Sequence, residues 1–246
     1  MVSLRALQRR QKYILKKEGM LSLLRKAISF LARHLFDHQI RRFYKKRSFY
    51  LYKAPLEDEI YQAKPPEIPD FSLKIVTERG QMEELISQGF DLGWLPLKAE
   101  EWLKKGVVAF CVFIGHELVF ISWVAMDKEA KDSLNEFPCP VDFSNGEAYL
   151  GWTAKHPKYW RVTRGVPLYV YFKVLQFLKE RGVKACYFVV RKNNTLTQNT
   201  LAKRIPIRPY GEGYYLRVLR WKFWREKPLY PSSKLRPNPL RLRTSG

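Results

Sequence analysis

The sequence predicts an α/β fold of the mixed, α+β kind, with a central sheet that contains a parallel strand–helix–strand unit. The stretch 147–191 supports this prediction, because it has the pattern of a strand, a loop, an amphipathic helix and a second strand in direct succession. Two apolar runs, 107–114 and 118–125, flank a tight turn at 115–117, as the strands of a β-hairpin do. A hydrophobic content of 46% in 246 residues permits one sizeable domain with appendages, or two small ones.

The strand–helix–strand unit begins with a strand at 147–154 and a loop rich in cations at 155–166. Pro167 then opens a helix that Gly182 ends, and a second strand occupies 184–191. Apolar residues recur every three or four positions along the helix, as one buried face requires: Leu168, Tyr171, Phe172, Leu175 and Leu178. Crossovers of this kind are right-handed and bind ligands at the carboxyl ends of their strands, so we expect functional residues there.

The remaining elements follow from the same periodicities. Before the unit, the pattern predicts a strand at 71–77, short helices at 81–87 and 99–105, and strands at 107–114 and 118–125. The stretch 127–146 contains charged residues, prolines and Asn145-Gly146, so we expect a long loop there, and long loops are often functional. After the unit, we expect a short helix at 195–204 and one long strand at 214–224.

The net charge of +22 is concentrated at the two ends of the chain. Residues 1–48 hold fourteen basic and two acidic residues, and residues 217–246 hold nine basic residues and one acidic residue, which leaves 49–216 nearly neutral. We therefore expect four parts. They are a basic amphipathic helical extension at 1–48, a proline-rich linker at 49–70, a folded body at 71–225 and a basic proline-rich tail at 226–246.

The basic extension has two interpretations. Leucines and an isoleucine fall on one face of a helix at 20–36, and this stripe either packs on the body or lies on an anionic membrane surface. The same charges could bind nucleic acid through counterion release. They form no recognisable RNA or DNA module, however, so nucleic acid is not expected as a partner, and the oligomeric state is left open.

Other classes of site and location are disfavoured. The three cysteines, Cys111, Cys139 and Cys186, have spacings that fit neither a disulfide framework nor a zinc site, so we expect reduced, buried thiols and no metal. No apolar run is long enough for a transmembrane helix, and the N-terminus lacks the pattern of a secretory signal. We expect a cytoplasmic protein whose extension at 1–48 can contact the inner face of the membrane.

The order of the elements and the loop before the long helix resemble the GNAT acetyltransferase superfamily, over about 71–224. The family's cofactor signature, Q/R-x-x-G-x-G/A, aligns with Val162-Thr-Arg-Gly-Val-Pro167, in which Gly165 is retained. Val162 and Pro167 depart from it. The Leu-x-x-Arg-Gly pattern at the helix end is matched by Phe177–Gly182, and Asn194 and Thr197 match an Asn and a small hydroxyl residue spaced by three.

This resemblance implies a mixed, mostly antiparallel sheet with acetyl-CoA as the acyl donor. The fourth and fifth strands of the family splay apart and leave backbone groups that pair with the pantetheine amides, here those of Trp152, Thr153, Ala154 and Lys155. The pyrophosphate would lie against Arg161, Arg164, Gly165, Val166 and Pro167, because a glycine and a helix N-terminus together can hold an anion. Asn194 and Thr197 would lie next to the pantetheine arm.

Two residues are candidates for proton transfer. Glu147 is the nearest plausible carboxylate for a general base that takes a proton from an amine, and its alternative role is an ion pair at a strand start. The family often has a Tyr seven residues after the Asn as general acid, and this chain has Leu201 there. Tyr210 is our candidate in its place, with Tyr214 and Tyr215 as alternatives.

The sequence therefore predicts a GNAT-type N-acetyltransferase that transfers an acyl group directly from acetyl-CoA to an amine, either a small molecule or an amino sugar. One alternative is a non-catalytic binding protein of this fold at the membrane surface, which the departures at Val162, Pro167 and Leu201 favour. The other is an aminoacyl-tRNA-dependent transferase, although one body of this size leaves no room for the twin domain of that class.

Overall fold

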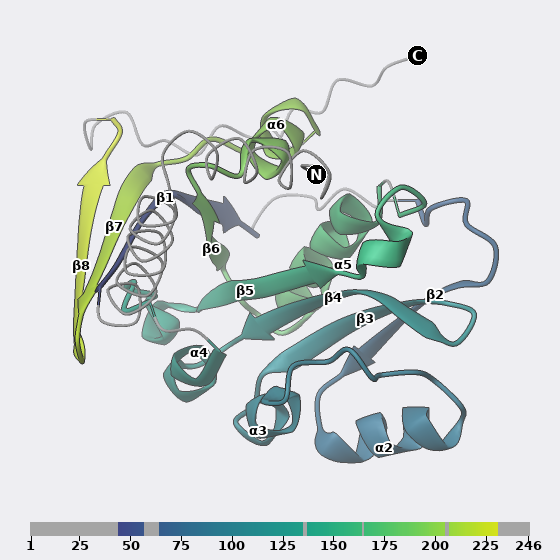
Figure 1. Ribbon diagram of the computed structural model, residues 1–246. Helices are drawn as coiled ribbons and strands as arrows, with labels where there is room; N and C mark the ends of the chain where they lie inside the picture. The colour runs from purple at the N-terminus through teal and green to yellow at the C-terminus, as the bar shows by residue number, and fades with distance from the viewer. Residues whose placement is uncertain (1–43, 57–63, 135–136, 164, 205–206, 231–246) are drawn as a thin grey trace, which may run out of the picture. The chain divides into compact units, whose positions relative to one another are not determined.

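The computed structural model describes residues 44–56, 64–134, 137–163, 165–204 and 207–230 (Figure 1). Three predicted features lie outside these residues: the helix at 20–36 with the rest of the extension up to residue 43, Arg164, and the tail from residue 231 onward. The chain divides into two compact units. The larger unit comprises Arg47–Tyr215 and Phe223–Gly246, and the smaller comprises Met1–Lys46 and Leu216–Lys222.

The described elements form a mixed α/β structure with an eight-stranded sheet. In chain order they are β1 (Tyr44–Pro55), β2 (Phe71–Val76), α2 (Arg79–Ser87), α3 (Ala99–Lys104), β3 (Val108–Ile114), β4 (Glu117–Ala125), α4 (Lys128–Leu134), η1 (Phe143–Asn145), β5 (Glu147–Lys155), η2 (Pro157–Tyr159), α5 (Val166–Glu180), β6 (Ala185–Arg191), α6 (Thr195–Arg204), β7 (Gly211–Val218) and β8 (Trp221–Pro228).

The strand order is β2-β3-β4-β5-β6-β1-β7-β8. The pairs β2–β3, β3–β4, β4–β5 and β6–β1 are antiparallel, whereas β5 and β6 are parallel. The predicted fold class is therefore confirmed: the sheet is mixed and mostly antiparallel, and the parallel strands are the two that α5 connects.

Alternating side chains divide the core of the larger unit into two layers. In β3, Val108, Phe110 and Val112 face one hydrophobic cluster, and Ala109, Cys111 and Phe113 face the other, as the two-residue period of a strand requires. The buried face of α5 belongs to the first cluster, and α2, α3 and α4 pack into the second. In Figure 1, α5 accordingly lies on one side of the sheet and these three helices on the other.

Strand β1 was missed by the sequence analysis. The predicted boundary between extension and linker, at residues 48 and 49, falls inside it, and its second half occupies the start of the stretch 49–70. Phe49, Leu51 and Ala54 are buried, and β1 pairs with β6 from Phe49↔Arg191 to Pro55↔Ala185. The sequence did not reveal β1, because basic residues interrupt its apolar positions and prolines follow it. Its partner strand β6 also lies far away in sequence.

Two further predictions were wrong. The stretch 127–146 is not one long loop, because Lys128–Leu134 forms α4 and Phe143–Asn145 forms η1. The long strand predicted at 214–224 is a hairpin of β7 and β8, with Leu219 in the left-handed region at φ 55°. Two-residue hairpin loops normally contain Gly or Asn, and no such residue marks this turn.

Candidate functional site

The central feature of the site is the divergence of β5 from β6. The parallel ladder joins Glu147–Leu150 to Ala185–Phe188 and stops there. Beyond it, β6 continues to Arg191 paired with β1, while β5 continues to Lys155 paired with β4. Figure 1 shows the two strands turning away from each other. Among the described residues, no ladder therefore joins 151–155 to a strand on the β6 side.

A bulge and a close helix contact coincide with this divergence. Val124 pairs with Leu150 and Ser122 pairs with Thr153, so two residues of β5, Gly151 and Trp152, face one residue of β4. A side chain at Gly151 would place its Cβ 2.2 Å from Leu134 Cδ2 and 2.9 Å from Leu134 Cγ. Gly151 thus allows α4 to pack directly on the bulge.

The N-terminus of α5 lies at the end of the loop that follows β5. Gly165 is exposed at the N-cap with φ 86°, and a Cβ there would meet no atom within 4 Å. Val166 is fully buried, Pro167 occupies the first turn, and the Tyr169 N–H donates to the Gly165 carbonyl at 3.0 Å. No side chain caps the helix, and the Val166 N–H donates to the Thr163 carbonyl at 3.3 Å. The positive end of a helix suits an anion, and the open space lies at the Cβ position of Gly165.

The side chain of Lys155 holds this loop together. Its Nζ donates to the carbonyl oxygens of Trp160 at 2.8 Å and Thr163 at 3.3 Å, and lies 5.1 Å from the centre of the Trp160 ring. Thr163 is fully buried, and its hydroxyl donates to the Tyr159 carbonyl at 2.7 Å. Because its ammonium is bound to the loop, Lys155 could offer a cofactor its backbone groups and not its side chain.

A second anchor comes from Glu117, the first residue of β4, and was not predicted. Both carboxylate oxygens of Glu117 accept from Lys158 Nζ at 2.9 Å, and Oε2 also accepts from the Tyr159 hydroxyl. The backbone N–H of His156 donates to Val119 O at 2.9 Å. No local pattern predicts the contact of Glu117 with Lys158, because 41 residues separate the two side chains.

The other predicted cofactor residues have differing environments. Trp152 is 42% exposed, with its ring 6.3 Å from that of Trp102, Thr153 is exposed and Ala154 is partly buried. Arg161 is exposed on the loop, and Arg164 lies outside the described residues. The structure brings the polypeptide from Trp152 to Lys155 and the N-terminus of α5 to one end of the parallel unit.

Asn194 and Thr197 follow the carboxyl end of β6, which is the corresponding end of the second parallel strand. Asn194 Oδ1 accepts from the Thr197 N–H at 3.2 Å, and its carbonyl accepts from the Gln198 N–H at 3.2 Å. These contacts make Asn194 the N-cap of α6. The Asn194–Thr197 spacing, which was matched to the family motif, therefore also serves to cap α6.

Glu147 lies at the other end of β5, about 26 Å from Lys155 along an extended strand. Its Oε1 accepts from Lys53 Nζ, its Oε2 accepts from the Asp142 N–H at 2.9 Å, and its side chain is 11% exposed. Since both oxygens already have protein donors, this environment favours a structural ion pair over a general base.

Tyr210 lies beside Tyr187, with ring centres 6.1 Å apart. Burial, together with the nearby charges of Glu226 and Glu147, raises its pKa above the ordinary value, although a hydrogen bond with Tyr187 opposes this shift. A raised pKa keeps the phenol protonated but makes it a weaker acid. Leu201 is buried in the α5-side core.

The two alternative tyrosines also have partners. Tyr215 is fully buried, with its ring edge-on to that of Phe137 and the ring centres 4.9 Å apart. The Tyr214 hydroxyl donates to Glu212 and accepts from Lys192.

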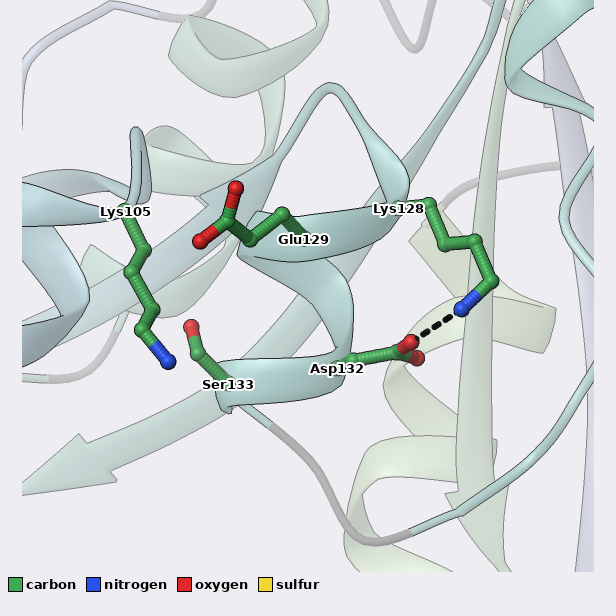
Figure 2. Close-up of a pocket in the computed structure, with 5 residues that line it drawn as sticks. All are labelled: Lys105, Lys128, Glu129, Asp132 and Ser133. Atoms are coloured by element: carbon green, nitrogen blue, oxygen red, sulfur yellow. Dashed lines mark hydrogen bonds and ion pairs between the residues drawn. The ribbon is translucent and has the colours of Figure 1, made fainter.

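A hollow lies on α3 and α4, on the opposite side of the sheet from α5. Figure 2 shows its lining residues, Lys105, Lys128, Glu129, Asp132 and Ser133, with Lys128 pointing to Asp132. The charges of both signs balance, and the ion-paired side chains of Lys128 and Asp132 are 82% and 50% exposed. Nothing about this hollow suits the binding of a cofactor.

Within the described residues, no group of three or more His, Cys, Asp or Glu side chains could hold a metal ion. No helix in that part of the chain is both long and apolar enough to cross a membrane.

Comparison with known proteins gives similarity in three dimensions alone. No protein-family model matches the chain, and no curated protein matches it in sequence. A Drosophila protein of solved structure is similar with a TM-score of 0.45 at 16% identity, over 78% of this chain and 58% of that one. A GCN5-related N-acetyltransferase from Sphaerobacter thermophilus gives a TM-score of 0.38 at 13% identity, over 81% and 56%.

A C-terminal (DUF2156) domain assigned to a lysylphosphatidylglycerol synthetase of Agrobacterium fabrum gives a TM-score of 0.36 at 14% identity, over 66% of this chain and 51% of that one. This chain spans between half and two thirds of the length of these three structures. TM-scores below 0.5 indicate partial overlap, so the function proposed below rests on the geometry of this chain.

Proposed function

We propose that the chain is an acyl-CoA-dependent N-acyltransferase that moves an acetyl group from acetyl-CoA to an amine. One observation carries the proposal: β5 leaves β6 after Leu150, runs on to Lys155 and leads into a loop that ends at the exposed N-terminus of α5. A strand edge and a helix N-terminus are thereby connected by one anchored loop.

This arrangement suits the chemistry of coenzyme A. Its pantetheine arm carries two amides. These can pair, as an added strand would, with the backbone of Gly151–Lys155 on the side where the described residues place no neighbouring strand. Five residues of strand extend about 16 Å, enough to align such an arm. The diphosphate would lie against the backbone around Gly165, where no atom lies within 4 Å of the position that a Cβ would take. The exposed Arg161 can add a positive charge beside the diphosphate.

Direct transfer is favoured over a covalent enzyme intermediate. The bound thioester supplies an activated acyl group, and the amine attacks its carbonyl while the thiolate leaves. The three thiols of the chain are buried, and burial raises the pKa of Cys111 and Cys186 to about 12 and that of Cys139 to about 11. Such thiols stay protonated and are poor nucleophiles. Because Glu147 is ion-paired with Lys53, and four residues of strand, about 13 Å, separate it from Gly151, we propose that water takes the proton of the amine. Glu147 as general base and Tyr210 as general acid are the alternative.

The test compares two glycines at opposite ends of the same helix. Gly165 and Gly182 have φ values of 86° and 73°, and a Cβ at either one would meet no atom within 4 Å. Gly165→Glu and Gly182→Glu should therefore cost similar stability, because both force a side chain into the left-handed region. Only Gly165→Glu places a carboxylate where the diphosphate would lie.

Thermal unfolding with acetyl-CoA provides the measurement. A ligand at a hundred times its dissociation constant adds about 2.7 kcal/mol, which corresponds to roughly 5–10 °C for a chain of this size. We expect this shift for the unmodified protein and for Gly182→Glu, and no shift for Gly165→Glu. An equal shift in both variants would show that the cofactor lies elsewhere, and no shift for any acyl-CoA or for free CoA would refute the proposal.

The non-catalytic alternative is favoured by the ion pair of Glu147 with Lys53 and by the buried Leu201. Acetyl-CoA binding without acetylation across a panel of amines and amino sugars would support it. If acyl-CoA gave no shift while tRNA bound with a steep salt dependence, an aminoacyl-tRNA-dependent transferase would replace both. Contact of residues 1–48 with an anionic membrane is a further proposal, which vesicle co-sedimentation can test.

A further inference from the structure

The turn between β7 and β8 has a conformation that its sequence does not favour. β7 ends at Val218 and β8 begins at Trp221, which leaves Leu219 and Arg220 as a two-residue loop. Leu219 has φ 55°, a conformation that Gly or Asn adopts at lower cost. Its side chain is 59% exposed, so little burial offsets the strain. Strain retained at an exposed position is a reason to look for a function there.

The tip of the hairpin, defined here as residues 217–222, combines exposed apolar side chains with cations. Val218, Leu219 and Trp221 are 38%, 59% and 61% exposed. Cations alternate with them: Arg220 and Lys222 are exposed, and Arg217 is partly buried. The Arg220 guanidinium lies 5.9 Å from the centre of the Trp221 ring. No Asp or Glu occurs between Gly213 and Arg225, so this segment carries a net positive charge.

We propose that this tip is a docking element for an anionic lipid surface. Tryptophan and leucine lower their free energy in the interfacial layer of a bilayer, while arginine and lysine extend toward lipid phosphates. Nucleic acid would engage the cations and Trp221, but it offers no favourable environment for Val218 and Leu219. This proposal and the acyl-CoA proposal rest on different residues, so each can fail without the other.

A fluorescent label at the tip tests the proposal in the full-length chain. The native cysteines are all buried, so Leu219→Cys introduces one reactive thiol for a polarity-sensitive fluorophore. We expect a blue shift and a gain in intensity with phosphatidylcholine vesicles that contain phosphatidylglycerol. Vesicles of phosphatidylcholine alone should give a much smaller change, and high salt should reverse the effect. The control is Leu97→Cys at the fully exposed turn before α3, whose label should not respond.

Two further variants sharpen the test. Arg220→Ala should weaken vesicle binding about five-fold, since each basic residue near an anionic surface raises the affinity by about that factor. Leu219→Gly should weaken binding while raising the unfolding temperature, because it removes the strained side chain. A Leu219→Gly variant that bound vesicles as well as the unmodified protein would contradict the proposal.

Other outcomes of the labelling experiment would also overturn the proposal. If the protein sediments with anionic vesicles while the label at 219 is unchanged, another segment makes the contact. If the label is already in an apolar environment without vesicles, part of the chain itself covers the tip. If it responds to tRNA and not to vesicles, the tip binds nucleic acid.

Discussion

Replacing Gly151 tests whether the bend of β5 depends on the close approach of α4. The new Cβ of Gly151→Ala would lie 2.2 Å from Leu134 Cδ2 and 3.3 Å from Tyr149 Cε1. Carbon atoms normally approach to about 3.5–4.0 Å, so Leu134 must move by more than about 1 Å. Leu134 is 6% exposed and packed in the core, and overpacking of this kind costs about 1–3 kcal/mol. For a chain of this size, the unfolding temperature should fall by roughly 2–12 °C.

A double-mutant cycle isolates the contact. Leu134→Ala alone should cost about 2–5 kcal/mol, because it leaves a cavity. In the double variant, the new methyl group occupies part of that cavity, so its cost should be smaller than the sum of the two single costs by at least about 0.5 kcal/mol. Denaturant unfolding followed by fluorescence gives the three free energies of unfolding.

The matched control is Gly80→Ala in α2, where a Cβ would meet no atom within 4 Å. It should leave stability unchanged or raise it slightly. Additive costs in the cycle, or a Gly151→Ala variant as stable as Gly80→Ala, would refute the reasoning. Gly151→Ala should also weaken acetyl-CoA binding, because the proposed pantetheine edge begins at this residue.

Three other predictions concern the loop, the thiols and the candidate base. Glu117→Ala should release Lys158 and Tyr159 and weaken acetyl-CoA binding several-fold in calorimetry, whereas Glu83→Ala, which removes an exposed ion pair with Arg79, should not. Because burial raises the pKa of the three thiols, the free energy of unfolding should fall as the pH rises. The stabilisation is fully present below about pH 8.5, where the thiols of the unfolded chain are also protonated, and it is lost toward about pH 11–12. Between these values each thiol contributes a slope of about 1.4 kcal/mol per pH unit. Cys111→Ala should flatten the slope of unfolding free energy against pH by one thiol's share, and an unchanged slope would contradict this reasoning. Glu147→Gln should lower stability by about 1–2 kcal/mol through its pair with Lys53, and a loss of turnover of about 10²–10⁴ with binding intact would instead identify Glu147 as the general base.

Local patterns predicted much of the fold and part of the candidate site. The spacing of apolar residues located α5, the two parallel strands and the β3–β4 hairpin, because each of these signals lies within a few neighbouring residues. Pro167 marked the start of α5 in the same way, since a helix start has its own local chemistry, whereas Gly165 was matched through the resemblance to the family signature. The extra helix α4 was missed because its short, charged sequence lies beside prolines.

The sequence by itself determined the mixed α/β class, the order of most elements, the buried thiols and the concentration of charge at the two ends of the chain. Tertiary structure decided the features that depend on residues far apart. The strand β1 pairs with β6, Glu147 binds Lys53 across 94 residues, and Glu117 at the start of β4 holds the β5–α5 loop through Lys158, 41 residues later. It also decided where β5 leaves β6, because that point depends on a bulge against β4 and on the room that Gly151 gives to α4. A local pattern fixes the conformation of a short segment, whereas pairing between distant segments is selected by the free energy of the whole packed core.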